Sequence, residues 1–147
     1  FCMALQEREQ HVSREGATSN LCTTQALNAV SAAVYLSTLG SSGLREVAEA
    51  CIGNARYAMK RLGEVDGVSV PAFDSPHFNE FVVGFDDTGV SPDEVNSRLL
   101  KRGIHGGKPL GSELAEFRGS SLWCTTEVHT KDEIDWMVDS LEELLEG

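Results

Sequence analysis

The densest group of side chains that could do chemistry lies near the start of the chain, in the segment REQHVSREGATSN at residues 8–20. Eight positions there hold four charged residues and one histidine, namely Arg8, Glu9, His11, Arg14 and Glu15. An unpaired buried charge costs several kcal/mol, so these side chains must pair with one another, face solvent or line a cleft. The residue types leave three interpretations open: an exposed loop, a structural network of ion pairs, or a binding site.

The other residues with catalytic or metal-binding side chains do not form a known motif. No histidine is paired at helical spacing with another histidine or with a cysteine, which disfavours a metal site. The four cysteines include no C-x-x-C pair, and no serine lies in a nucleophile elbow. Cys124 falls in a predicted strand and is interpreted as a core residue. We therefore expect neither a catalytic residue nor a metal site. The histidines are His11, His77, His105 and His129.

A glycine-rich stretch, GIHGGKPLG, occupies residues 103–111. It matches neither the Walker loop nor the dinucleotide fingerprint, because both need a helix that begins directly after the glycines. We interpret it as a loop that approaches a strand closely, with a contact to a ligand or partner as the alternative.

Charge and composition exclude several classes of protein. The net charge is −11 and only twelve residues are Lys or Arg, whereas nucleic-acid binding needs clustered positive charge. The widely spaced cysteines indicate free thiols in a reducing compartment, and no targeting segment is evident. The chain begins at Phe1, within an apparent strand, so we expect it to start inside a longer protein.

The polar segment leads into a stretch without any charged residue, from Gly16 to Leu44. Its Ala- and Leu-rich part predicts a helix over residues 24–39 that ends at Gly40. Apolar residues cover nearly every face of this helix, so it should be buried all round. Interspersed polar residues argue against a membrane span. In so small a domain, burial on all sides predicts packing against another domain or subunit.

Downstream, the patterns predict an amphipathic helix after Ser41, short strands at 68–71 and 78–85, and a helix from the capping signature SPDE at 91–94. A third strand at 120–128 and a final helix from TKDE at 130–133 follow. Three strands with helices on one face describe a small α+β domain with a short antiparallel sheet.

The stretch REQHVSREGATSNLCTTQALNAVSAAVYLSTLG resembles the C-terminal part of subunit 1 of the glycine cleavage system P-proteins, the decarboxylating glycine dehydrogenases. The resemblance continues through GLREVAE, FNEFVV, GIHGGKPLG and CTTEVHTKDEIDWMV, in order, along essentially the whole chain. It implies the small C-terminal domain of a fold type I pyridoxal-phosphate-dependent transferase. Residues 1–22 would be a connector from a missing large domain, and residues 23–147 the small domain with its leading buried helix.

The resemblance also implies a function. The family decarboxylates glycine and passes the aminomethyl group to the lipoyl arm of the H-protein, in the cytoplasm. Subunit 2 is the implied partner and would supply the lysine that binds pyridoxal phosphate. No lysine here is placed in an evident desolvated pocket, so this chain alone is expected to be inactive.

Seven residues are implied as interface or substrate-positioning groups. They are Arg8, His11, Arg14, Glu15, Thr18, Ser19 and Asn20. The family usually has arginine and lysine where this chain has Ser13 and Gly16, so two positive charges are missing from the segment.

Two alternatives remain open. One is the small domain of another fold type I enzyme, of the aminotransferase or cysteine desulfurase type. The other is a stand-alone ferredoxin-like regulatory or binding module, which would have to expose its apolar helix or dimerise through it.

Overall fold

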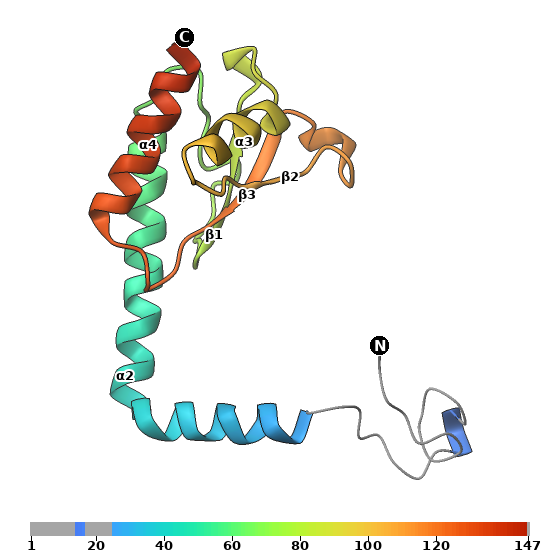
Figure 1. The fold of residues 1–147 in the computed structure, drawn as a ribbon, viewed down its shortest axis with the longest axis vertical. Helices are drawn as coiled ribbons and strands as arrows, with labels where there is room; N and C mark the ends of the chain where they lie inside the picture. The colour runs from blue at the N-terminus through green and yellow to red at the C-terminus, as the bar shows by residue number, and fades with distance from the viewer. Residues whose placement is uncertain (1–13, 17–24, 147) are drawn as a thin grey trace. The chain divides into compact units, whose positions relative to one another are not determined.

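The computed structural model describes residues 14–16 and 25–146 of the chain (Figure 1). The chain divides into two compact units, residues 1–45 and 46–147, each of which is considered by itself. In chain order the elements are η2 (Arg14–Gly16), α2 (Gln25–Leu62), β1 (Glu80–Gly84), η3 (Asp86–Thr88), α3 (Pro92–Lys101), β2 (Lys108–Pro109), η4 (Ala115–Phe117), β3 (Ser120–Cys124) and α4 (Lys131–Glu146).

Helix α2 contains both of the first two predicted helices, which meet at Gly40. This residue has φ 62° and ψ −171°, a non-helical conformation inside an otherwise helical run. A positive φ strains residues that carry a Cβ, and glycine avoids that strain. The sequence therefore places the interruption correctly, although helical turns resume directly after it.

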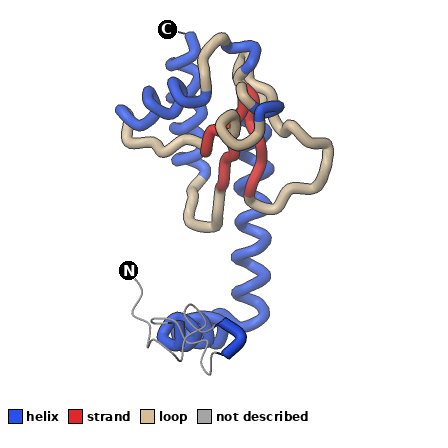
Figure 2. The backbone as a smooth tube through the Cα atoms, turned by 90° about the vertical axis from the view of Figure 1, so that its right-hand side faces the viewer, coloured by secondary structure: helices blue, strands red, loops and turns tan. Residues whose placement is uncertain are grey.

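The sheet is antiparallel, and its strands lie in the order β1-β3-β2. Figure 2 shows the strands side by side in red. Phe81 faces Trp123 across the β1–β3 pair, and Val83 faces Ser121. Side chains alternate between the two faces of a strand, so these four residues share one face. The predicted strand at 68–71 is wrong: Ser69 makes only an isolated bridge to Gly84. Pro71 has no N–H to continue a ladder there.

The core of the second unit lies between that face of the sheet and the helices. Its buried apolar residues come from the C-terminal part of α2, from α3 and α4, and from β1 and β3. Examples are Ala58, Phe81, Leu99, Trp123 and Leu141. The predicted fold class, a short antiparallel sheet with helices on one face, is confirmed.

The two predicted helix starts are capped to different degrees. In α4, Thr130 Oγ1 accepts from the Glu133 N–H at 3.2 Å, and the Glu133 carboxylate accepts from the Thr130 N–H at 2.8 Å. This is a complete capping box. In α3, Ser91 Oγ accepts from the Glu94 N–H at 3.3 Å, but the Glu94 carboxylate pairs with Arg98 instead.

The acidic C-terminal helix is attached to its neighbours partly through its carboxylates. Arg61 of α2 pairs with Asp135 and with Asp139, the latter at 3.2 Å. Arg102, which follows α3, pairs with Glu143 at 2.7 Å. Half-exposed pairs of this kind contribute up to about 1 kcal/mol each. Some of the negative charge at this end is therefore used within the domain.

Candidate functional site

The polar segment that drew attention in the sequence falls almost entirely outside the described residues. Of the seven predicted site residues, only Arg14 and Glu15 lie within them, in the single turn η2. Glu15 is exposed. The interface or positioning role of the seven residues stays a prediction.

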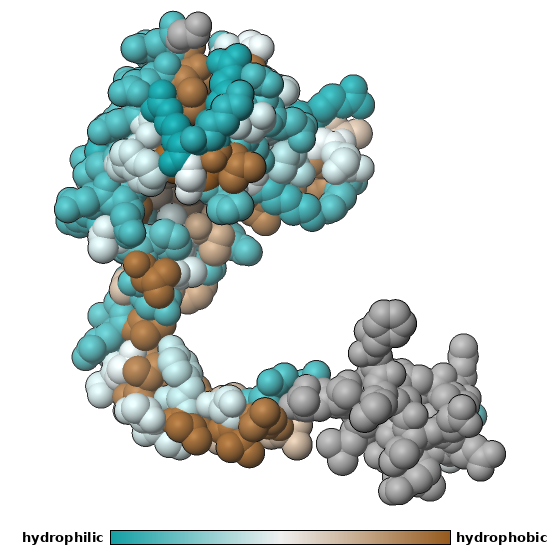
Figure 3. Space-filling model, in the orientation of Figure 1, coloured by the Kyte–Doolittle hydropathy of each residue, from teal (hydrophilic) through white to brown (hydrophobic). Residues whose placement is uncertain are grey.

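The apolar helix predicted to be buried is exposed in this chain. Leu27, Val30 and Val34 are 63%, 59% and 61% exposed, and the spacing of three and four places them on one face of α2. Figure 3 shows hydrophobic surface, in brown, along the first part of the helix. Because contiguous apolar surface of this kind marks an interaction site, this face is the first functional candidate.

None of the four lysines is desolvated. Lys60, Lys101, Lys108 and Lys131 are all exposed. Lys108 pairs with Glu113 at 2.7 Å, and the Lys131 ammonium lies 5.3 Å from the centre of the Tyr57 ring. A lysine that forms a Schiff base needs a pocket that lowers its pKa, so these surroundings do not fit that role.

Both described cysteines have a thiol pKa raised above its ordinary value, which disfavours the nucleophilic thiolate. Burial, followed by a hydrogen bond to the Glu127 carboxylate, raises the pKa of Cys51. Desolvation, followed by the Glu80 carboxylate, raises the pKa of Cys124. The interpretation of Cys124 as a core residue is wrong: it is exposed at the end of β3, because its neighbour Trp123 occupies the core face.

Metal-binding clusters and membrane-spanning helices are both absent from the described part of the chain. No group of three or more His, Cys, Asp or Glu side chains there could hold a metal ion. No helix of residues 25–146 is long and apolar enough to cross a bilayer.

The glycine-rich loop serves close packing. A Cβ added at Gly107 would lie 2.5 Å from Trp123 Nε1 and 2.7 Å from the Leu122 carbonyl oxygen, well inside van der Waals contact. The loop therefore approaches β3 more closely than any side chain permits, in agreement with the first of the two interpretations.

A turn before α4 is fixed to α2 by one amide. Asn54 Nδ2 donates to the carbonyl oxygens of Thr126 and His129, at 2.9 and 2.8 Å. His129 Nδ1 in turn accepts from the Thr126 N–H at 3.0 Å. This turn borders a cavity of about 270 Å³ that Trp136 and Met137 also line.

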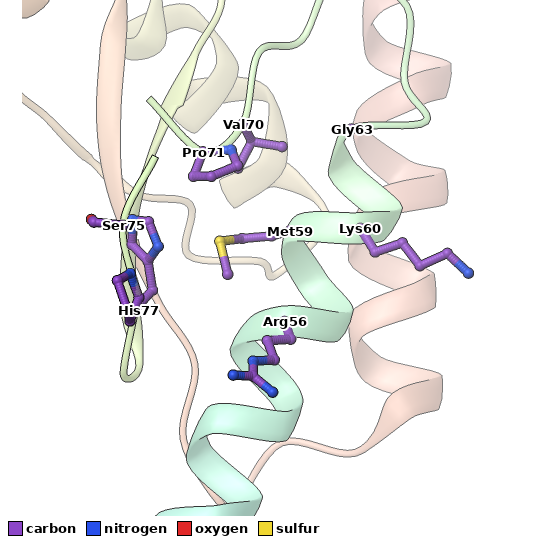
Figure 4. A pocket seen from close by; sticks show the side chains of 9 residues that line it. Arg56, Met59, Lys60, Gly63, Val70, Pro71, Ser75 and His77 are labelled. Atoms are coloured by element: carbon purple, nitrogen blue, oxygen red, sulfur yellow. The ribbon is translucent and has the colours of Figure 1, made fainter. Parts of the chain in front are cut away.

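A larger cavity, of about 500 Å³, lies between α2 and the loop that leads to β1 (Figure 4). Arg56, Met59 and Lys60 line it from the helix, and Ser75 and His77 line it from the loop. No Asp or Glu lines this cavity. Sequence reasoning missed it because the helical residues resemble an ordinary solvated face. The loop residues Ser75 and His77 lie well over a dozen positions away in the sequence and reach the helix only in the folded chain.

The arrangement of the sheet and helices indicates the class of protein to which the chain belongs. A three-stranded antiparallel sheet covered by helices on one face, preceded by a long helix with an exposed apolar side, is the small domain of fold type I pyridoxal-phosphate-dependent enzymes. A NifS-like protein superposes with a TM-score of 0.57 at 17% identity, and MppP soaked with the product 2-ketoarginine with 0.59 at 19%. At these identities the two show the fold alone.

The model of the family described as glycine cleavage system P-protein matches residues 1–141, and the chain belongs to this family. The crystal structure of an inhibitor-bound glycine decarboxylase (P-protein) superposes with a TM-score of 0.76 and is 34% identical. That match covers 96% of this chain and 31% of the crystallised one.

Two curated relatives carry the name probable glycine dehydrogenase (decarboxylating) subunit 1. The one from Staphylothermus marinus is 43% identical over 99% of this chain, and the one from Geobacillus kaustophilus is 48% identical over 96%. This chain spans only 31% and 30% of their respective lengths.

Proposed function

We propose that this chain is the C-terminal part of subunit 1 of a glycine-decarboxylating P-protein. The complete enzyme would decarboxylate glycine and transfer the aminomethyl group to the lipoyl arm of the H-protein, in the cytoplasm. The main support is the family match over residues 1–141, together with relatives that are named subunit 1 of this enzyme.

The contribution of this chain is to shape and assemble the enzyme. All four lysines are exposed, so none fits a Schiff base with pyridoxal phosphate, and we assign no step through that cofactor to these residues. Pyridoxal phosphate would be bound through a lysine of subunit 2. The seven residues of the polar segment would act beside it as interface or positioning groups.

The apolar face of α2 at Leu27, Val30 and Val34 is the proposed contact with the rest of the enzyme. Complete burial of one such side chain contributes about 1.5–3 kcal/mol, so three of them favour association by several kcal/mol. The partner surface would belong to the remainder of subunit 1 or to subunit 2. The same exposure disfavours a stand-alone module, which would leave this face in water.

Coexpression of full-length subunit 1 with a candidate subunit 2 tests this function. We expect glycine-dependent release of carbon dioxide when H-protein is present, and none from either subunit alone. Activity from subunit 1 alone would contradict the proposal, since it would require a cofactor lysine on this subunit.

The proposed interface can be tested in the same preparation. Val34→Asp should reduce copurification of the subunits or the solubility of subunit 1, whereas Asn28→Asp adds the same charge to an exposed polar position of that helix. If the two variants copurified equally well and were equally soluble, the apolar face would not be part of the interface.

A further inference from the structure

The cavity beside α2 combines positively charged groups with an apolar floor. Its walls hold the cations Arg56 and Lys60, together with His77, and no carboxylate, in a chain whose net charge is −11. The local charge is therefore opposite in sign to the net charge of the whole chain, which is unexpected for a surface without a binding role. The volume, about 500 Å³, lies within the range of small-molecule sites.

Arg56 is available for a ligand because no ion pair occupies it among the described residues. Arg61, Arg98 and Arg102 are each paired with a carboxylate, and Arg61 lies just over one helical turn from Arg56. Figure 4 shows the Arg56 guanidinium directed from α2 toward the loop that carries His77. The Lys60 side chain is directed away from that loop, so it adds only long-range attraction.

The floor of the cavity is apolar and belongs to the core. Met59 and Val70 are partly buried and pack against the core cluster. In Figure 4 the Met59 thioether projects between α2 and the loop. A flexible, polarizable methionine adapts to apolar groups of varied shape.

The opposite wall is held in place by backbone hydrogen bonds to β1. Ser69 and Gly84 exchange two such bonds, at 3.0 and 2.8 Å, and the Ala72 N–H donates to the Val82 carbonyl oxygen at 3.2 Å. The start of the loop is thereby fixed before any ligand arrives. A site formed in advance avoids part of the ordering cost of binding.

We propose that this cavity binds a small organic acid, a carboxylate or phosphate monoester with a short apolar body. The guanidinium of Arg56 holds the anionic group as a two-pronged donor, with the His77 ring as a further donor. The apolar body lies on Met59 and Val70. This binding property is independent of the proposed enzymatic role.

The test uses full-length subunit 1 in complex with subunit 2, labelled with ¹³C at the methionine methyl groups. Hexanoate and hexyl phosphate are titrated separately, and hexanol serves as the uncharged analogue. We expect a saturable shift of the Met59 methyl signal with at least one acid below about 10 mM. The acid that binds more tightly identifies the anionic group that the cavity prefers.

Arg56→Gln should weaken that binding about tenfold, because it removes the charge-assisted bonds. Arg118→Gln, which removes an exposed arginine outside the cavity, should leave it unchanged. His77→Gln is a second variant, which removes the ring proposed as a further donor. Unchanged thermal unfolding verifies that each variant is folded. Equal binding of hexanol, unchanged affinity in Arg56→Gln, or no Met59 shift with either acid would overturn the proposal.

Discussion

Replacement of glycine by alanine at two positions should change the stability of the second unit in opposite directions. At Gly107 the new methyl group would lie 2.5–2.7 Å from Trp123 Nε1 and the Leu122 carbonyl oxygen. Ordinary contact begins near 3.4 Å, so the loop or the strand must retreat by several tenths of an ångström. Overpacking of this kind costs about 1–3 kcal/mol. At Gly53, by contrast, nothing lies within 4 Å of the added methyl.

Gly53 lies inside α2, where alanine is favoured over glycine by about 0.5–1 kcal/mol. We therefore expect Gly107→Ala to lower the free energy of unfolding by about 2 kcal/mol and Gly53→Ala to raise it by about 0.8 kcal/mol. With a urea m-value of about 2 kcal/mol/M, the midpoints move by about −1 M and +0.4 M.

Tryptophan fluorescence during urea unfolding measures both changes. The only two tryptophans, Trp123 and Trp136, lie in the second unit, so the signal reports on that unit. An unchanged midpoint for Gly107→Ala would refute the close approach of the glycine-rich loop to β3. A loss of stability in Gly53→Ala would refute the claim that this helical position is open.

Three further outcomes are expected. Asn54→Ala removes two hydrogen bonds, of 2.9 and 2.8 Å, and should cost about 1–3 kcal/mol in urea unfolding. Val34→Asp should leave the tryptophan-detected midpoint unchanged, because this exposed residue lies in the other unit, while it reduces copurification of the subunits or the solubility of subunit 1. Hydrogen bonds from the backbone and side chain of Thr130 lower the pKa of Glu133 below its ordinary value in the folded state. That stabilisation is present above the unfolded pKa and lost as pH falls through the folded one, so Glu133→Gln should reduce the acid sensitivity of stability relative to Glu142→Gln.

Local patterns in the sequence predicted most of the elements. The starts of α3 and α4 followed from Ser91 and Thr130, and the interruption of α2 followed from Gly40, because caps and positive φ values depend on a few neighbouring residues. The two-residue strand β2 was not predicted, since its partner β3 defines it through long-range pairing. Long-range pairing also decides that residues 68–71, which were predicted as a strand, do not form one.

The candidate sites depended far more on tertiary structure. The sequence showed that residues 24–39 form an apolar helix, but only the fold showed that the described part of the chain leaves it exposed. Composition could not distinguish Arg56 from Arg61, although one lines a cavity and the other is bound to two carboxylates of α4.

The sequence by itself therefore determined the family, the order of the helices and the caps, because these depend on residue types within a few positions of one another. The tertiary structure decided why Gly107 must be glycine and which arginine lines a cavity. Both answers depend on side chains and backbone brought together from distant parts of the chain, and spacing along the sequence does not encode those contacts.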